Sequence, residues 1–594
     1  MMDILQYPFD ARLILRTKKK IRRELLAAPD ERMKKRIAIL GGSTTAEIRD
    51  MLELFLLDQG IEPLFYESEY NRYWQDVLFE NPELAAFQPD LIYIHTTTRN
   101  LTVFPNLTDD AGTISQKLNE TFGQFRQMWE KIADQYHCPV IQNNFERPRY
   151  RLLGNRDIAD IHGRSSFVSR LNTKFYEYAQ EHQNFFINDI DFLSSCFGLE
   201  KWSDPYDWHM YKYAPAVPAI PELAFNLANI IKAIYGKSKK ALVLDLDNTL
   251  WGGIIGEDGA EGIEIGQETP VGQIYSEFQS YIREHKQLGI LLAIDSKNDP
   301  ENALAGLNRP DSVLKAEDFL SIKANWEPKD QNLKKIAAEL NIGTDALVFV
   351  DDSPAERHIV RSQLPGTAVP EIGEPQNYIT TLDRCGFFET AGLSQDDLHR
   401  EEMYQANLQR TKAQSAFENY TDYLRSLEMK AEIRPFSALY MSRIAQLTNK
   451  SNQFNLITRR CSQAELEQIS ADPDYITLYG KLIDKFGDNG VVSLTFGHRE
   501  ADIFHIDLWL MSCRVLKRDM EFAMMDELVK RCQAAGIRSI RGYYYPTNKN
   551  HMVADFYKDQ GFVKLKEDCE GNTIWELDIS GGYEPKNKVI SVLP

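Results

Sequence analysis

Two carboxylates one residue apart follow a short apolar run near the middle of the chain. The run reads ALVL, and the acids after it are Asp245 and Asp247. A run that is apolar at every position is typical of a buried parallel strand, and ligands bind in open α/β sheets at the carboxyl ends of the strands. Because side chains alternate along a strand, two acids spaced in this way can converge on one cavity. They repel one another unless a cation lies between them, so the pattern predicts a charged ligand site.

Three other points of the chain carry groups that suit such a site. Ser296 follows an apolar strand predicted at 290–294, and Asp351 and Asp352 follow the run LVFV. Lys329 opens a predicted helix, where its charge opposes the helix dipole, and this unfavourable placement indicates an anionic partner. The simpler interpretations are that Ser296 is a turn or N-cap residue and that the acidic pair is a solvated helix start. Each of these features, taken singly, leaves both interpretations open.

The string DLDNTLWGGIIGEDG, residues 245–259, resembles the first motif of the haloacid dehalogenase (HAD) superfamily of phosphoryl-transfer enzymes, and within it the FkbH-like branch. That branch handles glyceryl groups from phosphoglycerate for carrier-protein thioesters. The resemblance implies that Asp245 is the nucleophile that becomes an aspartyl phosphate and that Asp247 is the general acid and base. Carboxyl groups suit both tasks, because one can attack phosphorus without deprotonation and the other can protonate the leaving oxygen.

The resemblance also implies the remaining parts of a phosphoryl-transfer site. Ser296 and Lys329 would hold the transferring phosphoryl group, and residues 251–259 would form a small flap over the site. Oxygen ligands and a phosphate substrate favour Mg²⁺ over zinc. The implied metal ligands are Asp245, Asp247 through its backbone carbonyl, Asp351 and Asp352. The implied substrate-binding residues are Thr249, Trp251, Gly252 and Asn298.

One position departs from the FkbH-like pattern. In that pattern the residue before the second-motif serine is a cysteine that holds the glyceryl group as a thioester, whereas this chain has Asp295. A carboxylate cannot form that thioester. The chain therefore either transfers its acyl group by another route or stops at phosphate removal.

The block before this region alternates strands and helices. After a basic helix at 11–27, strands are predicted at 36–40, 63–66, 91–95, 140–143 and 185–188. The alternation predicts a doubly wound parallel sheet, and the block resembles the flavodoxin-like fold of SGNH hydrolases, in which Ser43 would be the nucleophile. That class needs a late DxxH, and Tyr206 stands three residues before His209. We therefore predict a degenerate, non-hydrolytic domain in which Ser43 and Thr44 are turn or N-cap residues.

The last block has a different pattern. It is predicted to contain a long polar helix at 394–427, strands at 478–482, 490–496, 503–511 and 537–545, and a helix at 521–534. This order resembles the mixed α+β fold of GNAT acyltransferases, which bind coenzyme A pyrophosphate on a glycine-rich turn. Lys517 and Asp519 replace the glycines here, which weakens a site built from backbone amides. The candidate acyl- or pantetheine-binding residues are Arg514, Arg518, Asn550 and Tyr557, and Cys513 is either an inert thiol or an acyl carrier.

Length and composition are those of a large globular protein. The chain has 594 residues, 43% of them hydrophobic, and we predict three domains at 1–235, 236–388 and 389–594. The net charge of -19 argues against nucleic acid or an anionic membrane as a partner. Seven cysteines without a CxxC pair predict reduced thiols in a cytoplasmic protein.

The sequence supports three functions. The first is an FkbH-like enzyme with a phosphorylated three-carbon acid as substrate and an acyl carrier protein as acceptor. The second is a plain phosphatase in glycan or secondary-metabolite assembly, and the third is a scaffold that binds carrier proteins without turnover. The five groups expected for catalysis argue against the scaffold, because a scaffold does not need them; they are Asp245, Asp247, Ser296, Lys329 and Asp351.

Overall fold

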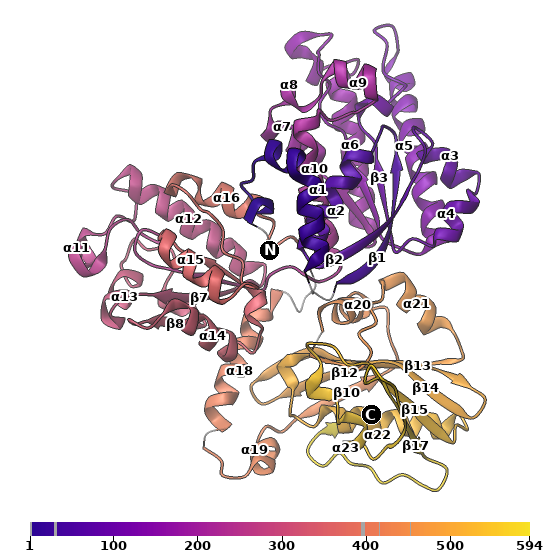
Figure 1. The fold of residues 1–594 in the computed structure, drawn as a ribbon, viewed down its shortest axis with the longest axis vertical. Helices are drawn as coiled ribbons and strands as arrows, with labels where there is room; N and C mark the ends of the chain where they lie inside the picture. The colour runs from indigo at the N-terminus through magenta and orange to yellow at the C-terminus, as the bar shows by residue number, and fades with distance from the viewer. Residues whose placement is uncertain (1–2, 29–31, 394–397, 415, 452, 594) are drawn as a thin grey trace. The chain divides into compact units, whose positions relative to one another are not determined.

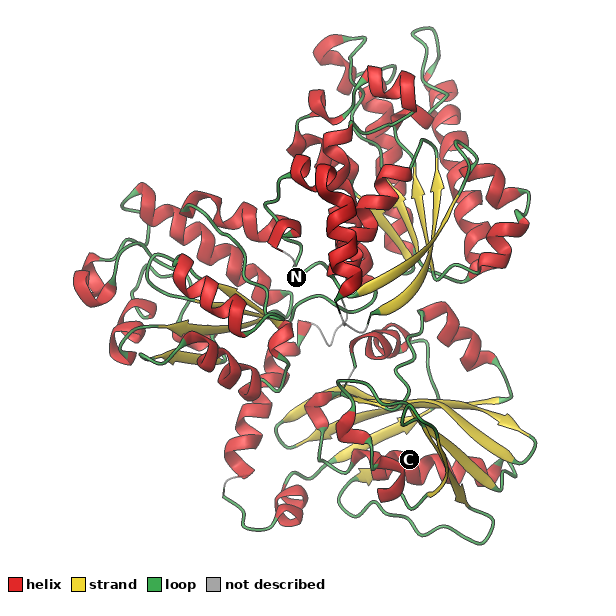
Figure 2. Ribbon diagram, in the orientation of Figure 1, coloured by secondary structure: helices red, strands yellow, loops and turns green. Residues whose placement is uncertain are grey.

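A computed structural model describes residues 3–28, 32–393, 398–414, 416–451 and 453–593. The chain divides into two compact units, each of which is a mixed α/β structure (Figure 1; Figure 2). Unit 1 comprises Met1–Ile234 with Glu389–Gly392, and unit 2 comprises Tyr235–Phe388 with Leu393–Pro594. Among the described residues, Cys138, Cys196, Cys532 and Cys569 are free thiols.

Unit 1 is built on a parallel sheet with strand order β2-β1-β3-β4-β5. The strands are β1 (Met33–Gly41), β2 (Ile61–Glu67), β3 (Leu91–His95), β4 (Val140–Asn143) and β5 (Phe185–Asn188). The helices are α1 (Ala11–Ala27), α2 (Ala46–Asp58), α3 (Tyr73–Leu78), α4 (Pro82–Phe87), α5 (Ala111–Tyr136), α6 (Arg164–Glu181), α7 (Ile190–Phe197), α8 (Leu199–Trp202), α9 (Pro205–Tyr211) and α10 (Ile220–Ile234). The predicted parallel α/β sheet of this block is confirmed.

Aromatic side chains of α5 and α6 form the core on one side of this sheet. Trp129 and Phe175 meet edge to face with ring centroids 4.7 Å apart, and both join a cluster with Ile92 and Ile94 of β3. Helices α1, α2 and α10 pack against one another. The stretch Val217–Ile234 is long and apolar enough to cross a membrane, but 72% of it is buried inside the unit, which is typical of a core helix.

The first sheet of unit 2 is also parallel, with strand order β8-β7-β6-β9. Its strands are β6 (Ala241–Leu244), β7 (Leu291–Ser296), β8 (Ser321–Ala324) and β9 (Leu347–Val350). Its helices are α11 (Ile255–Gly262), α12 (Pro270–Gln287), α13 (Pro300–Leu307), α14 (Lys329–Glu339), α15 (Pro354–Gln363) and α16 (Tyr378–Arg384). Alternate residues of β6 enter different cores: Leu242 and Leu244 pack with Phe278 of α12, whereas Val243 packs with Leu333 of α14. This explains why the run is apolar at every position.

The second sheet of unit 2 is mixed, with the order β16-β17-β15-β14-β13-β12-β10-β18, and β11 pairs with β14. Its strands are β10 (Lys430–Arg434), β11 (Phe454–Asn455), β12 (Tyr475–Asp484), β13 (Gly487–Glu500), β14 (Ile503–Met511), β15 (Ser539–Tyr544), β16 (Val563–Glu567), β17 (Thr573–Asp578) and β18 (Ser591–Val592). The helices are α18 (Arg400–Gln414), α19 (Tyr420–Ser426), α20 (Met441–Lys450), α21 (Gln463–Ala471), α22 (Met520–Ala534) and α23 (Phe556–Asp559).

The single polar helix predicted over 394–427 is wrong. The structure has α18 and α19 instead, separated by residues that include Asn419. The side chain of Asn419 accepts a hydrogen bond from the backbone N–H of Thr421 and so caps the start of α19. Residues 394–397 and 415 of the predicted helix lie outside the described residues.

Candidate active site

Three carboxylates meet at the carboxyl edge of the parallel sheet in unit 2. Asp245 follows β6, and Asp351 and Asp352 follow β9, the neighbouring strand. The backbone N–H of Asp245 donates to the carbonyl of Val350 at 3.0 Å, which continues the strand pairing to the first acid. One carboxylate oxygen from each of the three acids lies within 4.8 Å of the others. An all-oxygen, negatively charged donor set of this kind fits a hard divalent cation such as Mg²⁺.

Lys329 places a positive charge against two of these acids. It is the first residue of α14, its side chain is buried, and its Nζ donates to Asp245 Oδ1 at 2.8 Å and to Asp351 Oδ2. Burial by itself lowers the pKa of Lys329, but the charges of Asp245 and Asp351 outweigh burial and raise it. The lysine is therefore a permanent cation in the site. One ammonium against three carboxylates leaves an excess of negative charge that a metal ion would neutralise.

The loop after β9 is held by bonds to its backbone. The Arg357 guanidinium donates to the carbonyls of Asp351 and Asp352 at 2.8 and 2.7 Å, and Asp351 Oδ1 accepts from the Ser353 N–H at 2.8 Å. The hydroxyl of Thr249, which is fully buried, accepts from the Asp352 N–H at 3.2 Å. Burial, followed by the charge of Asp245, raises the pKa of both Asp351 and Asp352.

The carboxylate of Asp247 is held by three hydrogen-bond donors. Its Oδ1 accepts from Trp251 Nε1 at 2.8 Å and from the Ile255 N–H at 3.1 Å, and its Oδ2 accepts from Asn298 Nδ2 at 2.9 Å. Burial raises the pKa of Asp247, and these hydrogen bonds only partly oppose the shift. Asn248 turns the chain here with a φ of 54°. The second acid is thus oriented by three donors and favours its protonated form more than a free aspartate does.

After Asp247 the chain enters residues 251–259, where a flap was predicted. Gly252 and Glu264 form an isolated antiparallel bridge, and α11 lies between them in the sequence. Trp251 is fully buried and packs against Gly306 of α13, where an added Cβ would lie 2.7 Å from the Trp251 ring. The close approach requires glycine at this position of α13 and fixes the tryptophan that donates to Asp247.

Ser296 and Asp295 end β7, the other neighbour of β6. Ser296 is 2% exposed, and its carbonyl accepts from the Asn325 N–H at 3.1 Å. Asp295 is fully buried; its Oδ1 accepts from Asn332 Nδ2 at 3.0 Å, and its Oδ2 has no hydrogen-bond partner in the part of the chain that the structure describes. Burial raises the pKa of Asp295 to about 8. The residue that replaces the family cysteine is therefore largely a neutral acid inside the protein at neutral pH.

Asn332 and Arg357 are site residues that the sequence analysis missed. Asn332 lies one turn into α14 on the same face as Lys329, since the two are three residues apart. Arg357 lies three residues into α15. Helical spacing from Lys329 could have drawn attention to Asn332, whereas an arginine that bonds backbone carbonyls has no sequence signal.

Ser43 in unit 1 is buried. It is 2% exposed, and its Oγ has no hydrogen-bond partner among the described residues. Next to it, the Thr44 N–H and hydroxyl donate to the carbonyls of Lys212 and Tyr211, at the end of α9, at 3.0 and 2.8 Å. The N-cap of α2 is Thr45 rather than Ser43 or Thr44, and its side chain makes no capping bond.

The two predicted pantetheine-binding arginines are used inside unit 2. Arg514 and Arg518 are each 8% exposed. Arg518 bonds the Asp484 carboxylate at 3.2 Å and the carbonyl of Arg514 at 2.8 Å, and Arg514 Nε bonds the Ser512 hydroxyl at 3.3 Å. The side chain of Cys513 lies outside the described residues.

Asn550 and Tyr557 are also internal. Asn550 is fully buried and donates to the carbonyls of Asn455 and Tyr545, both at 2.9 Å. The Tyr557 hydroxyl accepts from the Tyr543 N–H at 3.2 Å, inside the core. All four predicted acyl-binding side chains therefore make hydrogen bonds within unit 2.

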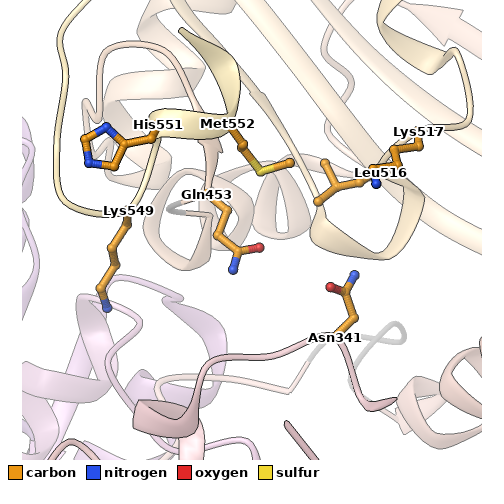
Figure 3. A pocket seen from close by; sticks show the side chains of 7 residues that line it. All are labelled: Asn341, Gln453, Leu516, Lys517, Lys549, His551 and Met552. Atoms are coloured by element: carbon orange, nitrogen blue, oxygen red, sulfur yellow. The ribbon is translucent and has the colours of Figure 1, made fainter. Parts of the chain in front are cut away.

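A pocket of about 500 Å³ in unit 2 has basic side chains in its lining. Figure 3 shows the side chains that line it: Asn341, Gln453, Leu516, Lys517, Lys549, His551 and Met552. Lys517 has a φ of 61° and stands where a GNAT turn would carry a glycine.

The comparisons with known proteins cover different shares of the chain. Residues 36–232 match the family model of the FkbH N-terminal domain. A crystal structure of the N-terminal part of a Bacteroides fragilis protein, containing a phosphatase domain and complexed with Mg, is 29% identical with a TM-score of 0.58. The match covers 63% of this chain and 99% of that chain. The search of curated proteins finds no match.

Acetyltransferase structures give weaker matches. The ribosomal-protein-S18-alanine N-acetyltransferase of Escherichia coli is 11% identical with a TM-score of 0.21, over 27% of this chain and 99% of that chain. The PaiA N-acetyltransferase of Thermoplasma acidophilum, in complex with coenzyme A, is 17% identical with a TM-score of 0.20, over 25% and 99%. At these TM-scores the likeness carries no conclusion about activity. The predicted FkbH-like resemblance is confirmed by the domain match and the phosphatase-domain structure.

Proposed function

We propose that this FkbH-like chain is a Mg²⁺-dependent phosphatase or phosphotransferase of HAD type. One observation carries the proposal: Asp245, Asp351 and Asp352 converge within 4.8 Å at a sheet edge, with Lys329 bonded to the first two. The phosphatase domain and bound Mg of the Bacteroides fragilis structure support the same function. In the predicted three-domain arrangement, this site belongs to residues 236–388.

Asp245 is the proposed nucleophile. One of its oxygens attacks phosphorus, the bond between phosphorus and the leaving oxygen breaks, and Asp247 gives that oxygen its proton. Asp247 then takes a proton from water, and the water oxygen attacks the aspartyl phosphate, which frees Asp245 and yields inorganic phosphate. The raised pKa of Asp247 supports the first task, because an acid must hold its proton until the leaving group needs it.

The metal ligands are Asp245, Asp351 and Asp352, with the Asp247 backbone carbonyl as the fourth group that the resemblance implies. A bound Mg²⁺ supplies positive charge that screens the phosphoryl oxygens from the carboxylates. Arg357 keeps Asp351 and Asp352 in place through their carbonyls and leaves their carboxylates available.

The phosphoryl group is held by Ser296 and Lys329, and the substrate by Thr249, Trp251, Gly252 and Asn298. Lys329 neutralises part of the phosphoryl charge in the same buried space in which it now neutralises Asp245. Trp251 and Asn298 act mainly through Asp247, since both donate to its carboxylate. The substrate is a phosphorylated three-carbon acid of the phosphoglycerate type or a similar small metabolite.

The FkbH-like function would also include acyl transfer to a carrier-protein thiol. The second candidate is a plain phosphatase, and Asp295 favours it. Its carboxyl is fully buried, bonded to Asn332, and cannot form a thioester. The side chains of four predicted acyl-binding residues make hydrogen bonds inside unit 2, which favours the phosphatase as well; they are Arg514, Arg518, Asn550 and Tyr557.

The N-terminal domain is an SGNH-like domain without hydrolytic activity, and the protein acts in the cytoplasm.

The test combines phosphate release with the mass of an acceptor. The full chain is incubated with Mg²⁺, a panel of phosphorylated three-carbon acids and an acyl carrier protein. We expect phosphate release without a glyceryl adduct on either protein, and a hydroxylamine-sensitive thioester on the Asp295→Cys chain alone. A glyceryl adduct on the unmodified chain or carrier would select the acyltransferase over the phosphatase. No phosphate release from any phosphate ester would contradict both.

A further inference from the structure

A second group of metal-ligating side chains lies in the mixed sheet of unit 2. His498 and Glu500 belong to β13 and His505 to β14, and one ligand atom of each lies within 4.8 Å of the others. The strands β13 and β14 lie side by side in Figure 1. None of these residues takes part in the carboxylate site or in the predicted acyl-binding set.

Strand geometry brings the three side chains together. His498 and Glu500 are two residues apart on β13 and so face the same side of the sheet. His505 is the direct cross-strand partner of His498, and their rings stack at 13° with centroids 5.1 Å apart. Glu500 Oε2 reaches His505 Nε2 at 3.5 Å.

Both histidines are oriented by a second group at Nδ1. His498 Nδ1 is paired with the Asp507 carboxylate at 2.9 Å, and His505 Nδ1 with the Tyr543 hydroxyl of β15 at 2.7 Å. A protonated Nδ1 donates to these oxygens, which leaves Nε2 of each ring with its lone pair. Metal-binding histidines have this arrangement, because a carboxylate or other acceptor at the far nitrogen fixes the ring and its tautomer.

A β-bulge makes the contact between His498 and Asp507 possible. The register between β13 and β14 shifts between Phe496 and Gly497, so Asp507 has no direct partner across the ladder. A bulge re-aims a side chain in this way. An added Cβ at Gly497 would lie 1.9 Å from the His505 carbonyl oxygen, so the close approach of the strands requires glycine there.

We propose that His498, His505 and Glu500 form a binding site for a divalent transition-metal cation, of which Zn²⁺ is the best match. Two imidazoles and one carboxylate are three of the four ligands of a tetrahedral zinc site, with one position left for water or another ligand. Nitrogen donors favour zinc over Mg²⁺, which prefers oxygen. The metal would join the ends of β13 and β14 in the C-terminal part of the chain.

The local charges are compatible with a cation. The charged groups that act on His505 are the side chains of His498, Arg541, Glu500 and Asp507. The positive charge of Arg541 is paired with Glu576 at 2.6 Å. The ligand Glu500 has a side chain that is 77% exposed, and His498 is 38% exposed, so a metal ion can reach the site from solvent.

The competing interpretation is a stacked pair of neutral histidines that packs the hairpin without a metal. The two interpretations differ at Glu500, which contributes no packing to a metal-free pair but one ligand of three to a metal site. They differ again at Asp507, whose charge strengthens His498 as a ligand.

The test uses the full-length chain, stripped of metals with a chelator and kept in excess Mg²⁺ so that the central carboxylates are saturated. Zn²⁺ is titrated in competition with a chromophoric chelator. We expect one Zn²⁺ per chain that the variant His498→Ala binds at least ~100-fold more weakly, and a loss of about 10–100-fold in Glu500→Gln and Asp507→Asn. Co²⁺ in the same site should give a visible absorption band that His498→Ala abolishes.

The matched control is His551→Ala, which removes another exposed histidine of the same part of the chain and should bind Zn²⁺ like wild type. His505 is buried and its replacement can unfold the hairpin, so the decision rests on the more exposed residues His498 and Glu500. Wild-type protein without a Zn²⁺ site, or Glu500→Gln and His498→Ala chains that bind Zn²⁺ as wild type does, would overturn the proposal.

Discussion

The two parallel sheets of this chain end in different kinds of polar edge. At the edge in unit 1, His95 Nδ1 meets the Tyr93 hydroxyl at 2.9 Å and Asn143 Nδ2 at 3.0 Å, and Asn188 Nδ2 donates to Asn143 Oδ1 at 2.8 Å. Burial lowers the pKa of His95 to about 3, so this network is neutral at neutral pH. The edge in unit 2 instead gathers Asp245, Asp351, Asp352 and Lys329.

The difference separates a structural edge from a reactive one. Neutral amides and hydroxyls that bond one another cost little to bury. The atoms at this edge that have no partner among the described residues, Ser43 Oγ and His95 Nε2, carry no charge that a cation would neutralise. Close carboxylates repel and are costly to bury, and a cationic ligand removes that cost. The same place in a parallel sheet therefore indicates a site only when its residues are charged and incompletely compensated.

The largest expected effect is on Asp245. We expect Asp245→Asn to lower phosphate release by at least a hundredfold, the low end of what a key catalytic group supplies, because an amide does not accept the phosphoryl group. A phosphate-release assay under saturating Mg²⁺ measures it, with circular dichroism as the control for folding. Activity above about a hundredth of wild type would remove Asp245 as the nucleophile.

Asp247→Asn should come next and should depend on the leaving group. An asparagine keeps the contacts with Trp251 and Asn298 in part but cannot donate a proton. We expect a loss of about 10²–10⁴-fold with an alkyl phosphate and a clearly smaller loss in the first step with an activated aryl phosphate. Burst kinetics separate that step from hydrolysis. An equal loss of the burst rate for both substrates would contradict the general-acid role.

Asp295→Asn should change stability rather than bond breaking. The folded-state pKa of about 8 lies above the unfolded value of ~3.9, so the folded state holds its proton more tightly. The contribution of Asp295 to stability is therefore fully present below pH ~4 and is lost as the pH rises toward 8. An asparagine does not titrate, so we expect the stability of the variant relative to wild type to rise by up to about 4 kcal/mol between pH 5 and pH 8. The cost of an unsatisfied amide is the same at both pH values and cancels from this comparison.

Chemical denaturation at the two pH values measures this difference. A stability difference that is the same at pH 5 and pH 8 would show that Asp295 is ionised in the folded protein.

The smallest expected effect is at the edge in unit 1. Ser43→Ala removes a hydroxyl that has no partner among the described residues, so phosphate release should stay at the wild-type rate and stability should change by no more than about 1 kcal/mol. The same assays as for Asp245→Asn apply. A large loss of phosphate release would contradict the interpretation that the edge in unit 1 is structural and only the edge in unit 2 is reactive.

The strands and the charged edge could be predicted from the sequence, but the contacts that support them could not. Runs such as ALVL and LVFV are apolar at every position because both faces of the sheet are covered, and this made β6, β9 and the acids after them predictable. Asn332 and Arg357 bond a buried carboxylate and two backbone carbonyls, and residue type does not indicate such contacts.

Other features depended on contacts between distant segments. The predicted long polar helix is interrupted between α18 and α19, and the side chain of Asn419 caps the start of α19; the polar composition of 394–427 does not indicate this interruption. Arg518 lies in a basic turn of the kind that can bind phosphate, yet its guanidinium bonds Asp484, a residue far away in the sequence. The pairing of His498 with His505 follows from the register of β13 and β14, which includes a bulge that cannot be predicted from the sequence.

The position of the phosphoryl group on the protein tests directly whether Asp245 is the nucleophile. The Asp247→Asn chain, which lacks the base that activates water, is mixed with Mg²⁺ and para-nitrophenyl phosphate, quenched in acid and digested for peptide mass spectrometry. We expect an acid-stable, hydroxylamine-labile phosphoryl group on Asp245. A phosphoryl group on Ser296 or any other residue, or phosphate release without any phosphorylated peptide in a chain that turns over, would contradict it.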